Sequence, residues 1–263
     1  MSTVLELDHL TKKFAGLTAV NDLSLRMEER TIHALIGPNG SGKSTTINLI
    51  TGFHKATSGK ILYRGEEVQN LPIHRIARKG VCRTFQNLEL CKSMTVLENV
   101  MLGGHQQTQI SFGRFIADFS GSAKEERTLR EQAEAVLDDI GLYKLRNENV
   151  ANISYGRQKV TELGRALMTR PKLLFLDEPA AGLNPTERVE FVNILLKVFD
   201  DGVDLFLIEH NMDVVMNISH QITVINFGAK IADGTPEEIQ NNPDVIAAYL
   251  GDRFAKRKEA ASC

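Results

Sequence analysis

Short apolar stretches separated by turns dominate the first 87 residues of the chain. Residues 4–7 and 24–27 have the length and composition of strands. Residues 31–36 form a nearly continuous apolar run that ends at a glycine, which predicts a buried strand. A helix is then predicted from Lys43 to Thr51, with Gly52 in the left-handed conformation that ends a helix.

From about residue 95 to residue 168 the apolar spacing becomes that of helices. One helix is predicted to begin at Ser122–Glu125, a capping box in which the serine oxygen accepts from a free amide and the glutamate reaches back. Five residues at helical spacing form its apolar face: Leu129, Ala133, Val136, Leu137 and Ile140. Gly141 is predicted to end it, so this part of the chain is expected to be a helical lobe.

Strands and helices alternate from Leu173 onward. Residues 173–176 and 205–208 are predicted strands, and a hairpin is predicted around Phe227–Ala229. Asn184–Glu187 begins a helix with proline at its first position. The inner face of that helix is expected to be Val192, Leu195, Leu196 and Phe199. Such alternation predicts an α/β fold with a parallel sheet.

Composition and charge narrow the class of protein. Of the 263 residues, 42% are hydrophobic and 24% are charged, which excludes disordered and fibrous chains. The net charge of -2 argues against binding of nucleic acid by the whole chain. No apolar run approaches the roughly 18 residues that cross a bilayer, and we expect no secretory signal. Cys82, Cys91 and Cys263 lack metal-ligand spacing and are expected to be free thiols.

The segment Gly37–Ser44 fits the phosphate-binding pattern G-x-x-x-x-G-K-[ST] between a predicted strand and a predicted helix. Its glycines let backbone N–H groups point inward around a phosphate, and the helix N-terminus adds positive potential. Lys43 is expected to reach the β- and γ-phosphates, and the Ser44 hydroxyl to bind Mg²⁺. The predicted nucleotide-binding residues of this segment are Asn39, Gly40, Ser41, Gly42, Lys43, Ser44 and Thr45.

A second motif, Leu173–Glu178, places two acidic residues at the end of an apolar strand. Ligands bind at the carboxyl ends of strands in α/β sheets. Asp177 is expected to hold Mg²⁺ through water, and Glu178 to act as general base for an attacking water molecule. Alone, such a pair is more often a helix cap or a solvated turn, but the phosphate loop favours catalysis.

Between these two motifs, Ile153–Gln158 resembles the signature motif of the ABC ATPases, which is normally Leu-Ser-Gly-Gly-Gln. Four other positions resemble motifs of that family and occur in its order: an adenine-stacking aromatic at Phe14, the Q-loop at Gln86, the D-loop at Ala180–Asn184 and the switch histidine at His210. The motifs together extend from residue 14 to residue 210, which makes the resemblance specific.

The resemblance implies a fold and a division of the chain. The expected fold is a P-loop NTPase (ABC ATPase) core with a parallel sheet, an antiparallel β subdomain and a helical subdomain. Residues 1–263 are expected to form a single domain. Within it, 1–94 and 169–263 would form the nucleotide-binding core with the β subdomain, and 95–168 the helical subdomain with the signature motif.

A narrower resemblance covers nearly the whole chain. Tyr155, Glu178–Pro185, Ile208–Met212 and the closing Asp233–Gly251 are similar to the ATP-binding subunits of branched-chain (hydrophobic) amino acid importers. This implies coupling of ATP hydrolysis to uptake of such amino acids. Import of urea or amides and export of lipid remain alternative functions, and a soluble ABC ATPase outside transport is less favoured, since one cassette and no sustained heptads are present.

Several positions depart from the general family pattern. Arg157 stands where the signature has glutamine, and Tyr155 replaces a glycine. Asn184 replaces the usual D-loop aspartate, which keeps a side-chain acceptor but removes a charge. Ser154 and Gly156 are retained, and they are the positions expected to offer a hydroxyl and a backbone amide to a γ-phosphate. The departures bear on the rate of hydrolysis more than on the identity of the site.

The resemblance also assigns roles and partners. Gln86 would sense Mg²⁺ and water, His210 would bind the γ-phosphate, Phe14 would stack on adenine and Val20 would contact the nucleotide. For Phe14 the alternative is an edge-strand aromatic with no ligand. Expected partners are transmembrane permease subunits, a second ABC ATPase subunit and, indirectly, a substrate-binding protein, but no nucleic acid. The expected location is the cytoplasm, peripheral on the inner face of the cell membrane.

Overall fold

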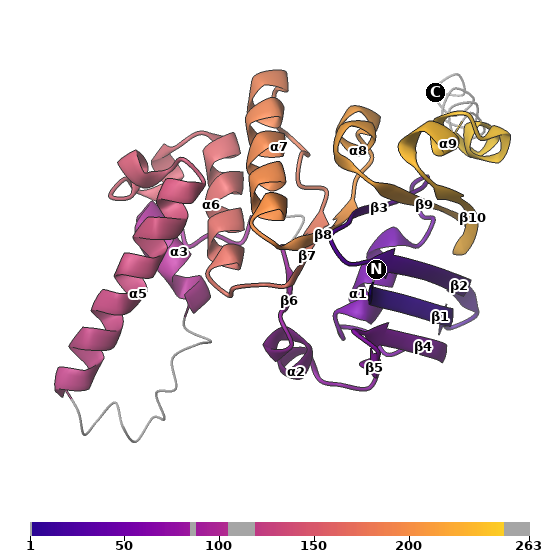
Figure 1. The fold of residues 1–263 in the computed structure, drawn as a ribbon, viewed down its shortest axis with the longest axis horizontal. Helices are drawn as coiled ribbons and strands as arrows, with labels where there is room; N and C mark the ends of the chain where they lie inside the picture. The colour runs from indigo at the N-terminus through magenta and orange to yellow at the C-terminus, as the bar shows by residue number, and fades with distance from the viewer. Residues whose placement is uncertain (1, 85–87, 105–118, 250–263) are drawn as a thin grey trace.

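The computed structural model describes residues 2–84, 88–104 and 119–249. A six-stranded sheet and a four-stranded sheet lie together, and a lobe of helices extends from one side (Figure 1). The predicted α/β architecture, with a largely parallel sheet, an antiparallel β unit and a group of helices, is confirmed.

The six-stranded sheet is parallel except at one edge. Its strands in spatial order are β10 (Ala229–Gly234), β9 (Gln221–Asn226), β3 (Ile32–Ile36), β8 (Asp204–Ile208), β7 (Leu173–Asp177) and β6 (Val81–Arg83). Strand β10 is antiparallel to β9, which confirms the predicted hairpin. Every residue of β3, β7 and β8 is buried, because both faces of the sheet are covered.

The four-stranded sheet is antiparallel and contains β2 (Leu17–Glu28), β1 (Thr3–Phe14), β4 (Ser58–Tyr63) and β5 (Glu66–Glu67). Strands β1 and β2 are much longer than residues 4–7 and 24–27, the predicted extents. The pairing register shifts near His9 and Asp22, whose φ angles are 50° and 53°. Such bulges interrupt the alternation of apolar and polar positions, and the sequence pattern therefore revealed only part of each strand.

Helix α1 (Lys43–Ile50) confirms the predicted helix after the phosphate-binding segment. Its buried residues Ile47 and Leu49 belong to an apolar cluster that also contains Phe175 and Phe206 of the six-stranded sheet and the inner residues of β1 and β2. The helix therefore fixes the phosphate-binding segment to both sheets.

The helical lobe is inserted between β6 and β7. Its main helices are α3 (Val96–Gly104), α5 (Phe119–Asp139) and α6 (Tyr155–Leu167). Helix α5 begins at Phe119, so the predicted start at Ser122–Glu125 is wrong: a Ser-x-x-Glu spacing also occurs inside a continuous helix. Gly141, with a φ of 74°, follows the helix as predicted.

The apolar face predicted for α5 is confirmed, since Leu129, Ala133, Leu137 and Ile140 are buried and Val136 packs against them. They belong to a cluster that continues onto one face of the six-stranded sheet. The lobe and the sheet therefore share one core. Among the described residues, no helix is both long and apolar enough to span a bilayer.

The other α-helical segments of the described residues are α2 (Ile73–Arg78), α7 (Pro185–Asp200), α8 (Met212–Ile218), α9 (Pro236–Gln240) and residues 243–249. Helices α7 and α8 lie on the side of the six-stranded sheet that faces away from β1 and β2 (Figure 1). The inner face of α7 is Phe191, Leu195, Val198 and Phe199. The predicted residues Val192 and Leu196 are only partly buried, because the buried stripe is turned toward Phe191 and Val198.

Candidate functional site

Most of the predicted site residues follow strands that end at the same edge of the parallel sheet. Gly37–Ser44 follows β3, Asp177 is the last residue of β7 with Glu178 directly after it, and His210 follows β8. The structure thus brings the phosphate-binding segment, the acidic pair and the histidine to the edge at which α/β sheets bind ligands.

The phosphate-binding segment requires glycine where its backbone approaches neighbouring chain closely. A Cβ at Gly37 would lie 2.0 Å from the carbonyl oxygen of Ile225, and one at Gly42 would lie 2.4 Å from that of Ala19. Gly40 instead needs its conformation, since its φ is 79° and its Cβ position is open. The segment is therefore folded tightly onto β9 and the start of β2.

Polar groups in this segment have the arrangement of an anion site. Lys43 is nearly buried, and its Nζ donates to the carbonyl oxygens of Gly37 at 2.8 Å and Pro38 at 3.0 Å. The Ser41 hydroxyl is buried, and no described residue is its hydrogen-bond partner. Ser44 is exposed at the start of α1, whose N-terminus has no side-chain cap. The uncapped N–H groups there can donate hydrogen bonds to an anion.

The turn between β9 and β10 supports the phosphate-binding segment. This contact was not predicted from the sequence. The amide of Gly228 donates to the Ser41 carbonyl at 2.9 Å, and the Gly228 carbonyl accepts from Asn21 at 2.8 Å. A Cβ at Gly228 would lie 2.8 Å from the Ala19 oxygen. The Phe-Gly-Ala turn was recognisable in the sequence, but its contact with the segment depends on the pairing of distant strands.

Asp177 is buried at the end of β7 and forms an ion pair with Arg83, the last residue of β6. Nη2 of Arg83 lies 2.7 Å from Oδ2 of Asp177, and Nη1 donates to Oδ1 of Asn48 in α1 at 2.6 Å. Arg83 was not among the site residues predicted from the sequence. Its relation to Asp177 depends on the pairing of β6 with β7, which are separated by the whole helical lobe.

Glu178 and His210 are adjacent. Nδ1 of His210 lies 3.7 Å from Oε2 of Glu178. The amide of Glu178 donates to the Ile208 carbonyl at 2.8 Å, and Glu178 has a φ of 49°, which is uncommon for a residue other than glycine. Such backbone strain is found at functional sites, where the surroundings fix the conformation.

Glu209 is a second residue at this edge that was not predicted from the sequence. It is fully buried, and its carboxylate accepts from the amides of Ala180, His210 and Asn211 at 2.8, 2.9 and 3.1 Å. The side chain thus joins the segment after Glu178 to the segment that carries His210.

Lys159, on α6, links the helical lobe to the acidic pair. It is buried, and its Nζ lies 3.5 Å from the carbonyl oxygen of Glu178. Burial lowers the pKa of the Lys159 ammonium.

The signature residues lie at the start of α6, against α7. The Ser154 hydroxyl accepts weakly from the amide of Arg157 and donates to Oε1 of Glu187 at 3.2 Å. A Cβ at Gly156 would lie 2.7 Å from the Glu187 carboxylate. Asn184 caps α7 in a reciprocal capping box with Glu187. No hydrogen bond or ion pair found for the described residues joins Ser154 or Gly156 to the phosphate-binding segment.

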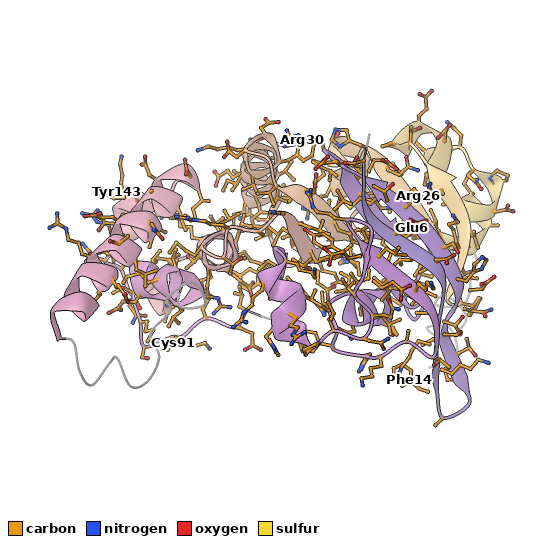
Figure 2. The ribbon with its side chains drawn as sticks, turned by 60° about the horizontal axis from the view of Figure 1, so that its bottom comes forward. Glu6, Phe14, Arg26, Arg30, Cys91 and Tyr143 are labelled. Carbon is orange, nitrogen blue, oxygen red and sulfur yellow. The ribbon has the colours of Figure 1, made fainter. Side chains whose placement is uncertain are left out.

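The three other residues that were predicted to contact the nucleotide or its metal ion are Phe14, Val20 and Gln86. Phe14 is partly exposed at the end of β1, far from Cys91 and Tyr143 of the lobe (Figure 2), and its ring meets the edge of His54. The side chain of Val20 is fully buried in the core, so it offers no surface to a nucleotide in this structure. Gln86 lies outside the described residues.

The residues at the sheet edge fit a magnesium nucleotide. The exposed Ser44 hydroxyl and the Asp177 carboxylate are the hard oxygen donors that Mg²⁺ prefers. Lys43, the buried Ser41 hydroxyl and the uncapped start of α1 fit a phosphate group. Among the described residues no cluster of three or more His, Cys, Asp or Glu could hold a metal ion.

Comparison with known proteins gives matches over nearly the whole chain. Residues 20–181 match a family model described as ABC transporter, and residues 229–255 match one described as Branched-chain amino acid ATP-binding cassette transporter. The chain is 46% identical over 250 residues to the high-affinity branched-chain amino acid transport ATP-binding protein BraF of Pseudomonas aeruginosa, covering 95% of this chain and 98% of that protein. LivG of Escherichia coli K12, with the same description, is 44% identical over 256 residues with the same coverage.

Solved structures agree with these matches. A nucleotide-free ATP-binding cassette from an ABC transporter has a TM-score of 0.82 and 33% identity, covering 94% of this chain and 98% of that chain. The ADP conformation of an ATP-binding cassette of an ABC transporter has a TM-score of 0.84 and 32% identity, covering 95% and 100%. The phosphate-binding segment, the acidic pair, the histidine and these relationships together show that the chain belongs to the ABC transporter family, as one of its ATP-binding cassettes.

Proposed function

We propose that the chain hydrolyses ATP as a subunit of an importer for branched-chain or other hydrophobic amino acids. The observation that supports hydrolysis best is the meeting of Lys43, Asp177, Glu178 and His210 at one sheet edge. The cargo is supported by the match of residues 229–255 and by the descriptions of BraF and LivG.

The phosphate-binding segment would hold the β- and γ-phosphates of ATP. Lys43 would exchange its carbonyl partners for phosphate oxygens, and the amides of the segment would surround the β-phosphate, with contributions from Asn39, Gly40, Ser41, Gly42 and Thr45. Ser44, Asp177 and Gln86 would hold Mg²⁺. When bound, Mg²⁺ neutralises charge on the phosphates.

Glu178 would accept the proton of the attacking water as its oxygen bonds to the γ-phosphorus and the bond to ADP breaks. The Ile208 carbonyl and the positive φ fix the backbone from which this carboxylate projects. His210 would donate to the γ-phosphate beside Glu178, and Glu209 would hold the His210 segment in place.

Ser154 and Gly156 would act on ATP that is bound to a second cassette, identical or related. Their contacts with α7 rather than with the phosphate-binding segment of their own chain support this arrangement. Each γ-phosphate would then touch both subunits, so ATP would favour the closed dimer and hydrolysis would release it. Phe14, whose ring is partly exposed, would stack on adenine.

The transmembrane partners would be permease subunits, reached through the helical lobe and through residues 88–100. A substrate-binding protein would deliver the amino acid to these subunits without contacting this chain. We place the chain on the cytoplasmic face of the membrane, and we expect Mg²⁺ and ATP as its ligands.

Uptake of labelled leucine tests this function in cells that lack other leucine importers and carry either the native chain or Glu178→Gln. We expect uptake only with the native chain, and competition by isoleucine and valine. Absence of leucine uptake in both strains would contradict the amino acid cargo. Labelled urea and short amides, tested in the same strains, would then identify the alternative cargo.

A further inference from the structure

The carboxylate that the proposed function assigns to Mg²⁺ already has a cation beside it. Nη2 of Arg83 lies 2.7 Å from Oδ2 of Asp177. Both side chains are largely enclosed, with 11% of Arg83 and 4% of Asp177 exposed. An ion pair this well shielded from water is weakly screened, so the arginine has a strong effect on what else the carboxylate can bind.

Arg83 is fixed in this position by neighbours from other elements. Nη1 donates to Oδ1 of Asn48 at 2.6 Å, and Asn48 belongs to α1, the helix that begins with the phosphate-binding residues. The guanidinium carbon also lies 5.8 Å from the ring centroid of Phe53, within the range of a cation–π contact. The planar guanidinium can bond two acceptors in a fixed geometry, which a lysine ammonium cannot reproduce.

Binding of Mg²⁺ near Asp177 must therefore overcome an existing interaction. A buried carboxylate without a counter-charge is unstable, and Arg83 removes that instability when no metal is present. An arriving cation gains less from a carboxylate that is already neutralised, and it is repelled by the guanidinium. By linkage, whatever favours the metal-free form lowers metal affinity by the same factor.

We propose that Arg83 is a positioning residue that holds Asp177 in the metal-free protein and competes with Mg²⁺ for this carboxylate. The inference depends on the proposed role of Asp177 in holding the metal. It assigns to Arg83 a control of metal affinity: the Arg83–Asp177 ion pair weakens as Mg²⁺ binds with nucleotide, and it forms again when they leave.

The test measures metal coupling without turnover. In the Glu178→Gln background, a fluorescent ATP analogue is titrated once with Mg²⁺ present and once with EDTA. The dissociation constant in EDTA divided by the dissociation constant in Mg²⁺ is the ratio compared among variants. Arg83→Gln is expected to increase this ratio about tenfold, within the range typical of coupled sites. Arg83→Lys, which keeps the charge but not the fork, should give a smaller increase.

Arg165→Gln is the matched control. Arg165 is also a partly enclosed arginine, but its ion pair is with Glu162 at 3.8 Å. Its ratio should equal that of the parent. As a second readout, Arg83→Gln should lower the unfolding temperature without ligand, and Mg²⁺ with ADP should raise it by more than in the parent. If Arg83→Gln does not fold, the ratio for Arg83→Lys decides the question.

An unchanged or smaller ratio for the Arg83 variants would overturn competition; a smaller one would mean that Arg83 supports the metal instead. Failure of the proposed function gives a different result. In that case the parent itself would show no effect of Mg²⁺, and Asp177→Asn would leave nucleotide affinity unchanged.

Discussion

Nδ1 of His210 lies 3.7 Å from Oε2 of Glu178, at the ends of two neighbouring parallel strands. The backbone of Glu178 is fixed by the Ile208 carbonyl and has a positive φ, so the direction of its side chain is set by the fold. A change confined to the end of that side chain should therefore alter chemistry without moving the site.

Glu178→Gln removes the proton acceptor and keeps the shape of the side chain. We expect the rate of phosphate release to fall by about 10²–10⁴-fold, while ATP affinity stays at the native value. Phosphate release and equilibrium binding of a fluorescent nucleotide measure the two quantities. Glu190→Gln, an exposed glutamate on α7, serves as control. Native turnover in Glu178→Gln would refute its role as general base.

Lys43→Ala should weaken nucleotide binding. The ammonium now bonds the Gly37 and Pro38 carbonyls, and in the complex it would bond phosphate. Loss of a hydrogen bond to a charged group of about 1.5–3 kcal/mol corresponds to a roughly 10- to 150-fold loss of affinity. Calorimetric titration with ATP measures it. Lys60→Ala, which alters an exposed lysine paired with Glu67, should leave affinity unchanged. Equal affinities in both variants would argue against phosphate contact by Lys43.

Asn184→Ala should destabilise the protein through α7. The side chain of Asn184 accepts from the amide of Glu187 at 2.9 Å, and N-cap residues contribute about 1 kcal/mol. Urea unfolding should show this loss, whereas Asn184→Asp, an equally good cap, should unfold like the native chain. Thr186→Ala, an exposed neighbour, is the control. If Asn184→Ala matches that control, the cap contributes nothing measurable.

Stability should fall in mild acid because of His33. Burial lowers the pKa of His33 to about 4, while Asp233 and Lys230 act on it in opposite directions. The folded state therefore excludes a proton that the unfolded state binds below about pH 6.5. The contribution of His33 to the free energy of unfolding is complete above that pH. It falls by up to about 1.4 kcal/mol per pH unit between pH 6.5 and 4.

His33→Asn removes this titration and leaves the other acid groups in place. The free energy of unfolding is measured in urea from pH 7.5 to pH 5. At the higher pH it should be larger for the native chain than for the variant. Their difference should shrink as the pH falls. A difference that does not depend on pH would show that His33 does not titrate with the expected sign.

The sequence predicted those parts of the site that are local in the chain. Gly37–Ser44 is recognisable because its glycines and lysine have fixed spacing, and the structure adds why Gly37 and Gly42 cannot carry a Cβ. Asp177 and Glu178 were predicted because an apolar strand precedes them. In each case one short segment determines the conformation.

Residues whose roles depend on pairing between distant segments could not be predicted in this way. Arg83 meets Asp177 only because β6 and β7 are neighbours, and Glu209 gains its role from an amide on another loop. Val20 was expected to contact the nucleotide, but burial in the core, a tertiary property, encloses it. The bulges near His9 and Asp22 likewise hid most of β1 and β2.

The insertion of the helical lobe between β6 and β7 has a consequence for how such chains can diversify. Because β6 and β7 are neighbouring parallel strands, the insert has only to carry the chain from the end of β6 back to the start of β7, across the length of the sheet. The insert can therefore change in length or surface without altering strand order, as long as its buried face still meets the shared core. Variation is accommodated in the insert, while Lys43 and Glu178 stay on a scaffold that does not have to change.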